Sequence, residues 1–238
     1  MQRLWTLIQN TANTKANILI TGETGVGKSA VAKAIHAMSN RANGPFIEVN
    51  CAVLHENLIE SELFGYEKGA FTGAASGGKI GKIELANHGT LFLDEIGELP
   101  PHIQSKLLQL IQEKTIERLS SNRRIELDFR LIVATNRNLE EEVQRGLFRS
   151  DLFYRLNVIR VHIPPLRQRP DDILPLAHQF LERFCREYGK QITFSPRFIS
   201  FLEQFSWPGN VRQLENLMER LVITSQDPIL DTTALPLD

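Results

Sequence analysis

The sequence has little of several residue types that mark common classes of protein. It contains only two cysteines, Cys51 and Cys185, which lie far apart and form no metal-binding or redox motif. Its six histidines form neither an HExxH motif nor a cluster with cysteine. These absences argue against a zinc site and indicate buried thiols in a reducing compartment.

Long apolar runs and an excess of charge of one sign are also lacking. No run reaches the roughly 20 apolar residues that span a bilayer, and the N-terminus does not resemble a signal peptide. The formal net charge of −1 argues against a broad basic surface and against tight, non-specific binding of nucleic acid by this stretch. We therefore expect a cytoplasmic protein without membrane contact. Hydrophobic residues, 42% of the chain, suffice for a globular core.

The sequence does contain a phosphate-binding loop. Residues 22–29 fit the pattern GxxxxGK[ST], after a strand-like run at 18–20 and before a helical stretch at 29–38. In such a loop, backbone N–H groups and the helix N-terminus bind phosphate oxygens. We expect Lys28 to contact the β- and γ-phosphates of ATP and Ser29 to ligate Mg²⁺. The expected nucleotide-binding residues are Gly22, Glu23, Thr24, Gly25, Val26, Gly27, Lys28 and Ser29. A glycine-rich turn with a surface lysine is the alternative, which the flanking strand and helix disfavour.

Strand-like apolar runs alternate with helical patterns over the first two thirds of the chain. The expected strands cover residues 18–21, 46–49, 91–93, 131–134 and 158–163. This alternation predicts an α/β fold with a parallel five-stranded sheet flanked by helices. Ligands of such sheets bind at the carboxyl ends of the strands.

The connection between residues 49 and 91 is too long for a simple crossover. After a helical segment at 57–64 it contains a glycine-rich excursion at 65–81, and loops of this length are usually functional or disordered. Phe71 stands there among glycines and alanines. Such an aromatic residue either contacts a partner or packs back onto the domain. The sequence around it favours neither alternative. A second insertion is expected near residues 119–127, after a helix at 103–112.

The composition changes at residues 164–170, which are rich in proline and arginine. Beyond them we expect three helices, at 172–188, at 195–205 and from Asn210, whose side chain we expect to cap the third. We therefore expect an α/β domain over residues 1–165 and a small all-α domain over residues 166–238.

Two carboxylates follow the strand at 91–93. We expect Asp94 to hold Mg²⁺ and Glu95 to orient and deprotonate the attacking water. A capped strand end before a turn is the alternative, which the upstream phosphate loop disfavours. Thr135 or Asn136, after another strand, could bind the γ-phosphate or the water, although spacing alone favours a simple turn.

Phosphoryl transfer also needs positive charge near the γ-phosphate, commonly from an arginine of another subunit. The candidates are Arg149, Arg155, Arg160, Arg167 and Arg169. Most arginines in proteins are only solvated or paired at the surface, so composition does not choose among them.

The motifs together resemble a known family. Residues 62–74, with Gly-Ala-Phe-Thr-Gly-Ala at 69–74, resemble the signature of the sigma-54-dependent transcriptional activators, bacterial enhancer-binding proteins with a central AAA+ ATPase domain. Residues 89–96, 148–156, 164–167 and 207–212 match as well, so the resemblance covers nearly the whole chain. It implies an AAA+ P-loop NTPase domain followed by a helical lid.

The resemblance also implies roles for residues that spacing left open. Arg149 and Arg155 correspond to arginine fingers that reach the ATP of the neighbouring subunit in a ring hexamer or heptamer. Thr135 and Asn136 correspond to the first sensor. Arg212 corresponds to the second sensor. Asn50 corresponds to a switch asparagine that exchanges contacts with Glu95.

The loop at residues 69–74 is implied to contact sigma-54 RNA polymerase holoenzyme and nearby promoter DNA. In the family, ATP turnover raises and lowers this loop, and the closed promoter complex is remodelled to the open one. The implied partner-binding residues are Gly69, Ala70, Phe71, Thr72, Gly73 and Ala74. Enhancer DNA would be bound only through a C-terminal domain missing from this chain, so we expect an isolated central domain.

Some positions depart from the family pattern. Ser29 stands where the family often has glutamate and restores the usual Mg²⁺ ligand. Residues 119–123 lack the common Gly-Gly, and Ile83 replaces an aromatic residue. The chain also begins after a region that helps to hold adenine in relatives, from which we expect reduced nucleotide affinity.

Two other functions are compatible with parts of the pattern. A general AAA+ protein-remodelling ATPase would use an aromatic pore loop, but not the hexapeptide at 69–74. A non-hydrolysing, ligand-gated DNA-binding regulator would not need the residues of hydrolysis. The sequence retains them, which argues against this alternative: Lys28, Asp94, Glu95, Arg149 and Arg155.

Overall fold

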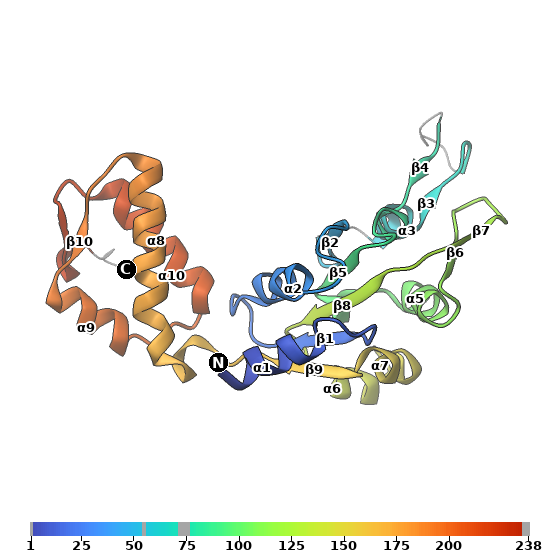
Figure 1. Ribbon diagram of the computed structural model, residues 1–238, viewed down its shortest axis with the longest axis horizontal. Coiled ribbons are helices and arrows are strands. Elements are labelled where there is room, and N and C mark those ends of the chain that lie inside the picture. Colours follow the sequence, from blue (N-terminus) through green and yellow to red (C-terminus); the bar gives the residue numbers. More distant parts are fainter. Residues whose placement is uncertain (1, 54–55, 71–76, 235–238) are drawn as a thin grey trace. The chain divides into compact units, whose positions relative to one another are not determined.

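The computed structural model describes residues 2–53, 56–70 and 77–234. The chain divides into two compact units (Figure 1). The first combines Met1–Thr21 with Lys28–His162, and the second combines Gly22–Gly27 with Ile163–Asp238. The phosphate-binding loop therefore belongs mostly to the second unit. The division of the chain between residues 165 and 166 stays a prediction.

A parallel five-stranded sheet forms the centre of the first unit and confirms the predicted α/β fold. Its strand order is β2-β5-β8-β1-β9. The strands are β1 (Ile18–Thr21), β2 (Phe46–Asn50), β5 (Thr90–Asp94), β8 (Arg130–Thr135) and β9 (Ile159–His162). All six residues of β8 and all four of β1 are buried, so both faces of the sheet are covered there. This double burial explains why the central strands read as continuous apolar runs in the sequence.

Helices precede and connect these strands. They are α1 (Gln2–Thr11), α2 (Lys28–Ala37), α3 (Glu56–Phe64), α4 (Lys82–Leu85), α5 (Pro101–Glu113), α6 (Leu139–Gln144) and α7 (Ser150–Leu156), with the 3-10 turn η1 (Ile96–Glu98) after β5. The buried guanidinium of Arg130 donates hydrogen bonds to the carbonyl oxygens of Thr11 and Ala12. Because the last carbonyls of a helix have no partner within it, these bonds both cap α1 and attach it to β8.

Two antiparallel hairpins extend from the first unit side by side (Figure 1). The first pairs β3 (Gly65–Tyr66) with β4 (Lys79–Ile80), and the second pairs β6 (Thr115–Glu117) with β7 (Arg124–Glu126). Backbone bonds join them: the Glu67 N–H donates to the Leu119 carbonyl, and the Leu119 N–H donates to the Gly65 carbonyl. Residues 71–76, in the connection from β3 to β4, lie outside the described residues.

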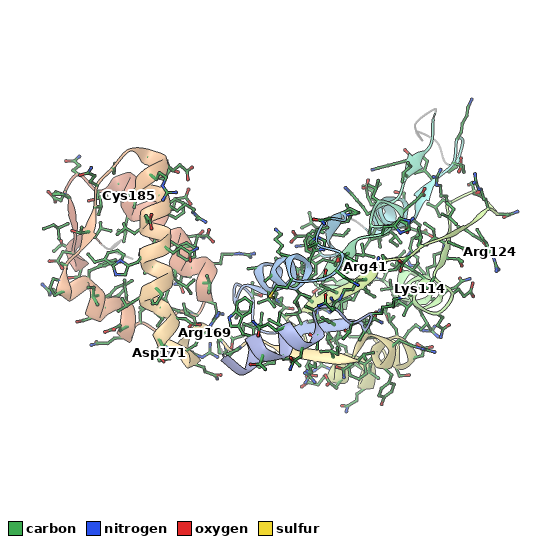
Figure 2. The ribbon with its side chains drawn as sticks, viewed as in Figure 1. Arg41, Lys114, Arg124, Arg169, Asp171 and Cys185 are labelled. Carbon is green, nitrogen blue, oxygen red and sulfur yellow. The ribbon has the colours of Figure 1, made fainter. Side chains whose placement is uncertain are left out.

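The second unit is helical, as predicted. It contains α8 (Ile173–Tyr188), α9 (Pro196–Gln204) and α10 (Asn210–Thr224), with 3-10 turns η2 (Leu166–Gln168), η3 (Pro170–Asp172) and η4 (Thr232–Ala234). It also contains a short parallel pair, β10 (Thr193–Phe194) and β11 (Ile229–Leu230), which no pattern predicted because strands of two residues show no periodicity. Figure 2 shows Arg169 and Asp171 near the beginning of α8 and Cys185 near its end.

The prediction that Asn210 caps α10 is wrong. Gly209 occupies the N-cap position, and Asn210 is the first residue of the helix, with a left-handed φ of 55°. Its amide makes hydrogen bonds to other segments instead, which are described below. By contrast, Ser195 does cap α9, since its hydroxyl accepts from the Phe198 N–H at 3.0 Å. Within the part of the chain that is described, no helix has the length and apolarity to cross a membrane.

Candidate functional site

The polar ends of the central strands lie at one edge of the sheet. In the strand register, Asn50 is paired with Asp94, and Thr21 is paired with Thr135. Parallel strands place their carboxyl ends together, which is why residues far apart in sequence meet here. The sheet therefore brings the predicted residues of β2, β5 and β8 to a common edge.

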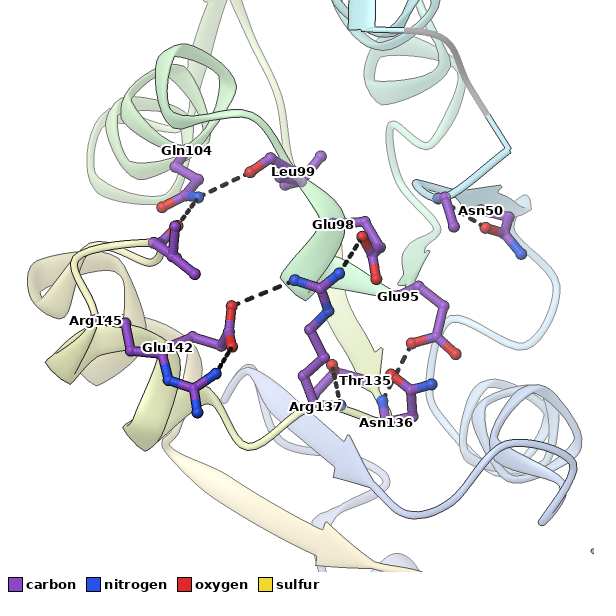
Figure 3. Close-up of polar contacts among 12 residues, drawn as sticks. Asn50, Glu95, Glu98, Leu99, Gln104, Thr135, Asn136, Arg137, Glu142 and Arg145 are labelled. Carbon is purple, nitrogen blue, oxygen red and sulfur yellow. Dashed lines mark hydrogen bonds and ion pairs between the residues drawn. The ribbon is translucent and has the colours of Figure 1, made fainter.

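Glu95 is fixed by two groups of the first unit. Its Oε1 atom forms an ion pair with Lys28 Nζ at 3.3 Å, and its Oε2 atom accepts from the Asn136 N–H at 3.1 Å (Figure 3). The exposed fractions of the two paired side chains are only 6% for Lys28 and 17% for Glu95. Glu95 also adopts a left-handed φ of 53°. A non-glycine residue in this conformation is strained, and such strain is typical of functional sites.

Asp94 lies beside this pair in a partly buried position. Its Oδ1 atom accepts from the Glu95 N–H at 3.0 Å. Burial, and next the nearby charge of Glu95, raise the pKa of Asp94, while Lys28 acts in the opposite direction. Ionisation of Asp94 is thus energetically unfavourable in these surroundings, and a cation next to the carboxylate would make it more favourable.

The donor set at this edge fits a magnesium ion that is bound together with phosphates. Among the described residues, no group of three or more His, Cys, Asp or Glu side chains could hold a metal by itself. Mg²⁺ commonly uses only one or two protein oxygens and takes the rest from water and substrate phosphates. Asp94 at the end of β5 and Ser29 in the first turn of α2 can supply such oxygens.

The predicted sensor and switch residues have local partners. The buried Thr135 hydroxyl accepts from the Arg137 N–H at 3.0 Å, and Asn50 Oδ1 accepts from the Ala52 N–H at 2.9 Å (Figure 3). Asn136 meets Glu95 through its backbone N–H. Arg137 extends the network to Glu98 and Glu142, at 2.6 and 3.3 Å. The roles of Thr135, Asn136 and Asn50 toward a γ-phosphate stay predictions.

The candidate arginines differ in their surroundings. Arg149, at the N-cap position of α7, pairs with Asp151 at 2.7 Å and donates to Ser105 at 3.2 Å. Arg155, in the last turn of α7, is exposed. Arg160 pairs with Glu140 at 2.6 Å.

The other two candidates, Arg167 and Arg169, contact the phosphate-binding loop. Arg167 donates to both carboxylate oxygens of Glu23, at 2.8 and 2.5 Å. Arg169 donates to the Val26 carbonyl at 2.8 Å. Both arginines therefore contact the loop itself.

The glycines of the loop adopt conformations that other residues avoid. Gly25 has a φ of 80°, and a Cβ atom placed on it would lie 2.4 Å from the Gly209 carbonyl oxygen. Gly27 has a φ of 102°, and nothing lies within 4 Å of the position its Cβ would take. Gly25 is thus required for close packing on the chain before α10, whereas Gly27 leaves open space beside the loop.

Asn210 and Arg212 complete the contacts of the loop. The Asn210 amide donates to Glu23 Oε2 at 3.1 Å and to the Thr24 carbonyl at 3.0 Å, and the Arg212 N–H donates to the Gly25 carbonyl at 3.2 Å. No pattern in the sequence indicated a site role for Asn210, Arg167 or Arg169 on the loop. Asn210 and Arg167 do fall within the motifs at 207–212 and 164–167, which was the one available signal.

Two family models match the chain. A sigma-54 interaction domain matches residues 1–162, and an AAA+ ATPase lid domain matches residues 167–238. The boundaries of the two matches leave only residues 163–166 unassigned.

Curated relatives and solved structures agree with these matches. The chain is 52% identical over 226 residues to the regulatory protein AtoC of Escherichia coli (strain K12), covering 94% of this chain and 49% of AtoC. It is 50% identical over 228 residues to the Nif-specific regulatory protein of Azospirillum brasilense, covering 96% of this chain and 36% of that protein. A crystal structure of NtrX from Brucella abortus in complex with ATP matches with a TM-score of 0.90 and 39% identity, over 99% of this chain and 54% of NtrX. The chain thus spans between about a third and about half the length of these relatives.

Proposed function

The chain belongs to the sigma-54 interaction domain family of AAA+ ATPases, and we propose that it hydrolyses ATP to convert the closed promoter complex of sigma-54 RNA polymerase into the open complex. The family match over residues 1–162 carries this proposal. The hexapeptide at 69–74 supports it, because it lies in the connection of the β3–β4 hairpin. The NtrX structure with bound ATP supports ATP as the nucleotide.

The chemistry would take place at the end of β5. Glu95 would accept a proton from a water molecule whose oxygen attacks the γ-phosphorus, while the bond to the β–γ bridging oxygen breaks and ADP leaves. Lys28 would bind the β- and γ-phosphates, so it has to exchange its present partner Glu95 for phosphate. Asp94 and Ser29 would hold Mg²⁺, which supplies charge neutralisation and orientation of the phosphates.

The remaining groups would report the state of the γ-phosphate. Thr135 and Asn136 follow β8, and the Asn136 N–H already contacts the Glu95 carboxylate. Asn50 ends β2 as the register partner of Asp94, which supports an exchange of contacts with Glu95. Arg212, in the first turn of α10, would act as the second sensor.

We propose that catalysis requires a homo-oligomeric ring, a hexamer or heptamer. Arg149, at the N-cap position of α7, and Arg155, in its last turn, are exposed and would supply positive charge to the ATP of the neighbouring subunit. Large apolar side chains are exposed beside them: Leu147 by 56%, Tyr154 by 74% and Val158 by 59%. Exposed aromatic and aliphatic groups next to arginine are typical of protein interfaces. Arg149 would leave Asp151 when the ring assembles.

A network of ion pairs would connect turnover to the loop at 69–74. Arg118, in the β6–β7 hairpin, donates to both carboxylate oxygens of Glu84 on α4, at 3.0 and 2.8 Å. It also donates to Glu67 at 3.0 Å, two residues before Gly69. Because α4 leads into β5, a change at Asp94 and Glu95 has a continuous path to the first hairpin.

The proposed partners are sigma-54, the polymerase holoenzyme and promoter DNA near the loop. Binding to enhancer DNA would require a further domain of a longer protein, in keeping with the greater length of the relatives. Of the partner-binding residues, Gly69 and Ala70 are described: Gly69 has a φ of 80°, and the Ala70 N–H donates to the Glu67 carbonyl. Phe71, Thr72, Gly73 and Ala74 lie outside the described residues.

The substitution Thr72→Ala tests the partner directly. We expect the variant to hydrolyse ATP at a substantial rate and to form no open complex with sigma-54 holoenzyme, measured by permanganate reactivity of the melted promoter. Ser76→Ala, in the same loop but outside the hexapeptide, is the matched control and should form open complexes normally. Full open-complex formation by Thr72→Ala would refute the proposed role of the loop.

A further inference from the structure

Each residue from Glu23 to Val26 is contacted by a hydrogen-bond donor of the lid. Arg167 and Asn210 hold the Glu23 carboxylate, and Asn210 also holds the Thr24 carbonyl. The next two carbonyls accept from the backbone N–H of Arg212 and from the guanidinium of Arg169, at 3.2 and 2.8 Å. The lid thus binds three consecutive carbonyl oxygens of the phosphate-binding loop.

These contacts determine which way the loop presents its N–H groups. All described peptide bonds are trans, so the N–H of each peptide unit points away from its carbonyl oxygen. With the carbonyls of Thr24, Gly25 and Val26 directed to lid donors, the N–H groups of Gly25, Val26 and Gly27 point away from those donors. Three such N–H groups in succession form the anion-binding surface of a phosphate loop. A carbonyl turned to that side would instead repel a phosphate.

Asn210 contributes to this orientation of the loop through its side-chain amide. Its side chain is fully buried, and Oδ1 accepts from the Leu166 N–H at 2.8 Å while Nδ2 donates to Glu23 and Thr24. A buried amide must find partners for these groups, so the loop, the chain at Leu166 and the start of α10 are fixed together.

Glu23 adds a charged contact at the surface of the loop. The two parallel hydrogen bonds from Arg167 form a bidentate pair, which is the strongest geometry for arginine and carboxylate. These bonds, and next the bond from Asn210, lower the pKa of Glu23 to about 2. Glu23 is therefore ionised at neutral pH, and the pair persists under physiological conditions.

We propose that Arg167, Arg169 and Asn210 are positioning residues that preorganise the phosphate-binding loop for nucleotide by holding its carbonyl oxygens and Glu23 on the lid. The inference rests on the proposed function, because it assumes that the loop binds ATP and ADP. Its consequence is that damage to these lid contacts weakens nucleotide binding and leaves the chemical step intact. Lid and loop would respond to nucleotide as one unit.

The test is calorimetric titration of the whole chain with ADP and Mg²⁺, together with the ATP dependence of hydrolysis. We expect Arg167→Gln to weaken ADP binding and to raise KM by about tenfold, equivalent to about 1.4 kcal/mol, with kcat within about twofold of the wild type. Arg167→Lys keeps the charge without the bidentate geometry. Its affinity for ADP should lie between those of the wild type and Arg167→Gln. Asn210→Ala should weaken binding at least as much. Arg167 is exposed, so its variants will fold even if Asn210→Ala does not.

The matched control is Arg186→Gln, which removes an exposed arginine from an ion pair with Glu182 elsewhere in the lid. It should bind ADP like the wild type. In a double-mutant cycle, Glu23→Gln with Arg167→Gln should bind no more weakly than Arg167→Gln alone, because the two residues act as a pair.

The outcomes separate the two levels of the proposal. If the wild-type chain binds neither ADP nor ATP, the proposed function itself fails. If the wild type binds ADP and both Arg167 variants bind equally well, the positioning role is overturned while the ATPase proposal stands. A loss of kcat with unchanged KM in Arg167→Gln would also overturn it.

Discussion

The carboxylates after β5 and the phosphate-binding loop are held in place by different kinds of contact. Glu95 is paired with Lys28 in a buried setting, with exposed fractions of 17% and 6%, and strand register fixes its neighbours. Glu23 pairs with Arg167 at the surface, with exposed fractions of 43% and 44%, across a separation of 144 residues. Packing thus fixes the proposed chemical groups, whereas the binding loop is held both by this surface pair and by the buried amide of Asn210. We infer that the first region determines the rate of hydrolysis and the second the affinity for nucleotide.

The largest effect is expected from Glu95→Ala. Removing the proposed general base should lower kcat for ATP hydrolysis by about 10²–10⁴-fold. Nucleotide binding should persist, because the contacts of the lid with residues 23–26 of the loop are untouched. Glu98→Ala removes a carboxylate from the same end of the sheet, where it pairs with Arg137, and serves as the control. Normal turnover in Glu95→Ala would show that another residue is the base.

A smaller loss, confined to binding, is expected from Gly25→Ala. The new Cβ would lie 2.4 Å from the Gly209 carbonyl oxygen, so the loop or the chain before α10 has to move. We expect ADP affinity to fall by about tenfold or more, measured by calorimetry. Gly189→Ala is the control, because Gly189 has a similar φ of 65° in the lid and open space around its Cβ position. Equal ADP affinity of the two variants would mean that close packing of loop and lid does not matter.

Arg118→Ala should reduce open-complex formation more than it reduces ATP hydrolysis. Three hydrogen bonds to Glu84 and Glu67 are lost, and with them the side-chain contacts of the second hairpin with α4 and with Glu67. We expect open-complex formation to fall by about tenfold relative to ATP hydrolysis. Arg124 is an exposed residue of the same hairpin that pairs with Glu117 (Figure 2 labels Arg124), and Arg124→Ala should behave like the wild type. A proportional fall of both activities in Arg118→Ala would argue for a general loss of folding.

The smallest effect concerns pH and the Glu23–Arg167 pair. The pKa of Glu23 is lowered from 4.5 to about 2, so its contribution to stability is complete above pH 4.5 and is lost as the pH falls toward 2. The Tm difference between the wild type and Glu23→Gln should therefore be constant between about pH 8 and pH 6 and shrink below 4.5. It should amount to a few degrees at most, since exposed pairs contribute little. A difference that grows on acidification would contradict the assignment.

The sequence predicts well those features that depend on neighbouring residues. The phosphate loop, the carboxylates after β5 and the buried strands are each encoded within a few consecutive positions. The lid helices follow from apolar periodicity and from the Ser195 cap. Such local signals need no knowledge of the fold.

The features that could not be predicted depend on contacts distant in sequence. Asparagine is favoured at helix N-caps, yet Asn210 bonds to groups 44 and 187 residues away. The second hairpin spans β6 and β7 from Thr115 to Glu126 and so begins before the predicted insertion, because a strand of three residues is too short to show an alternating pattern. The contacts of Arg118 and Arg167 have the same origin, since a surface arginine carries no local sign of its partner.

The most direct test of the account is the ATP dependence of hydrolysis, measured side by side for the wild type, Glu95→Ala and Arg167→Gln. We predict opposite defects in the two variants. Glu95→Ala should lose kcat and keep its affinity for ADP, whereas Arg167→Gln should lose affinity and keep kcat at saturating ATP. If both variants lose the same parameter, the division of roles between the carboxylates after β5 and the lid-bound loop is wrong.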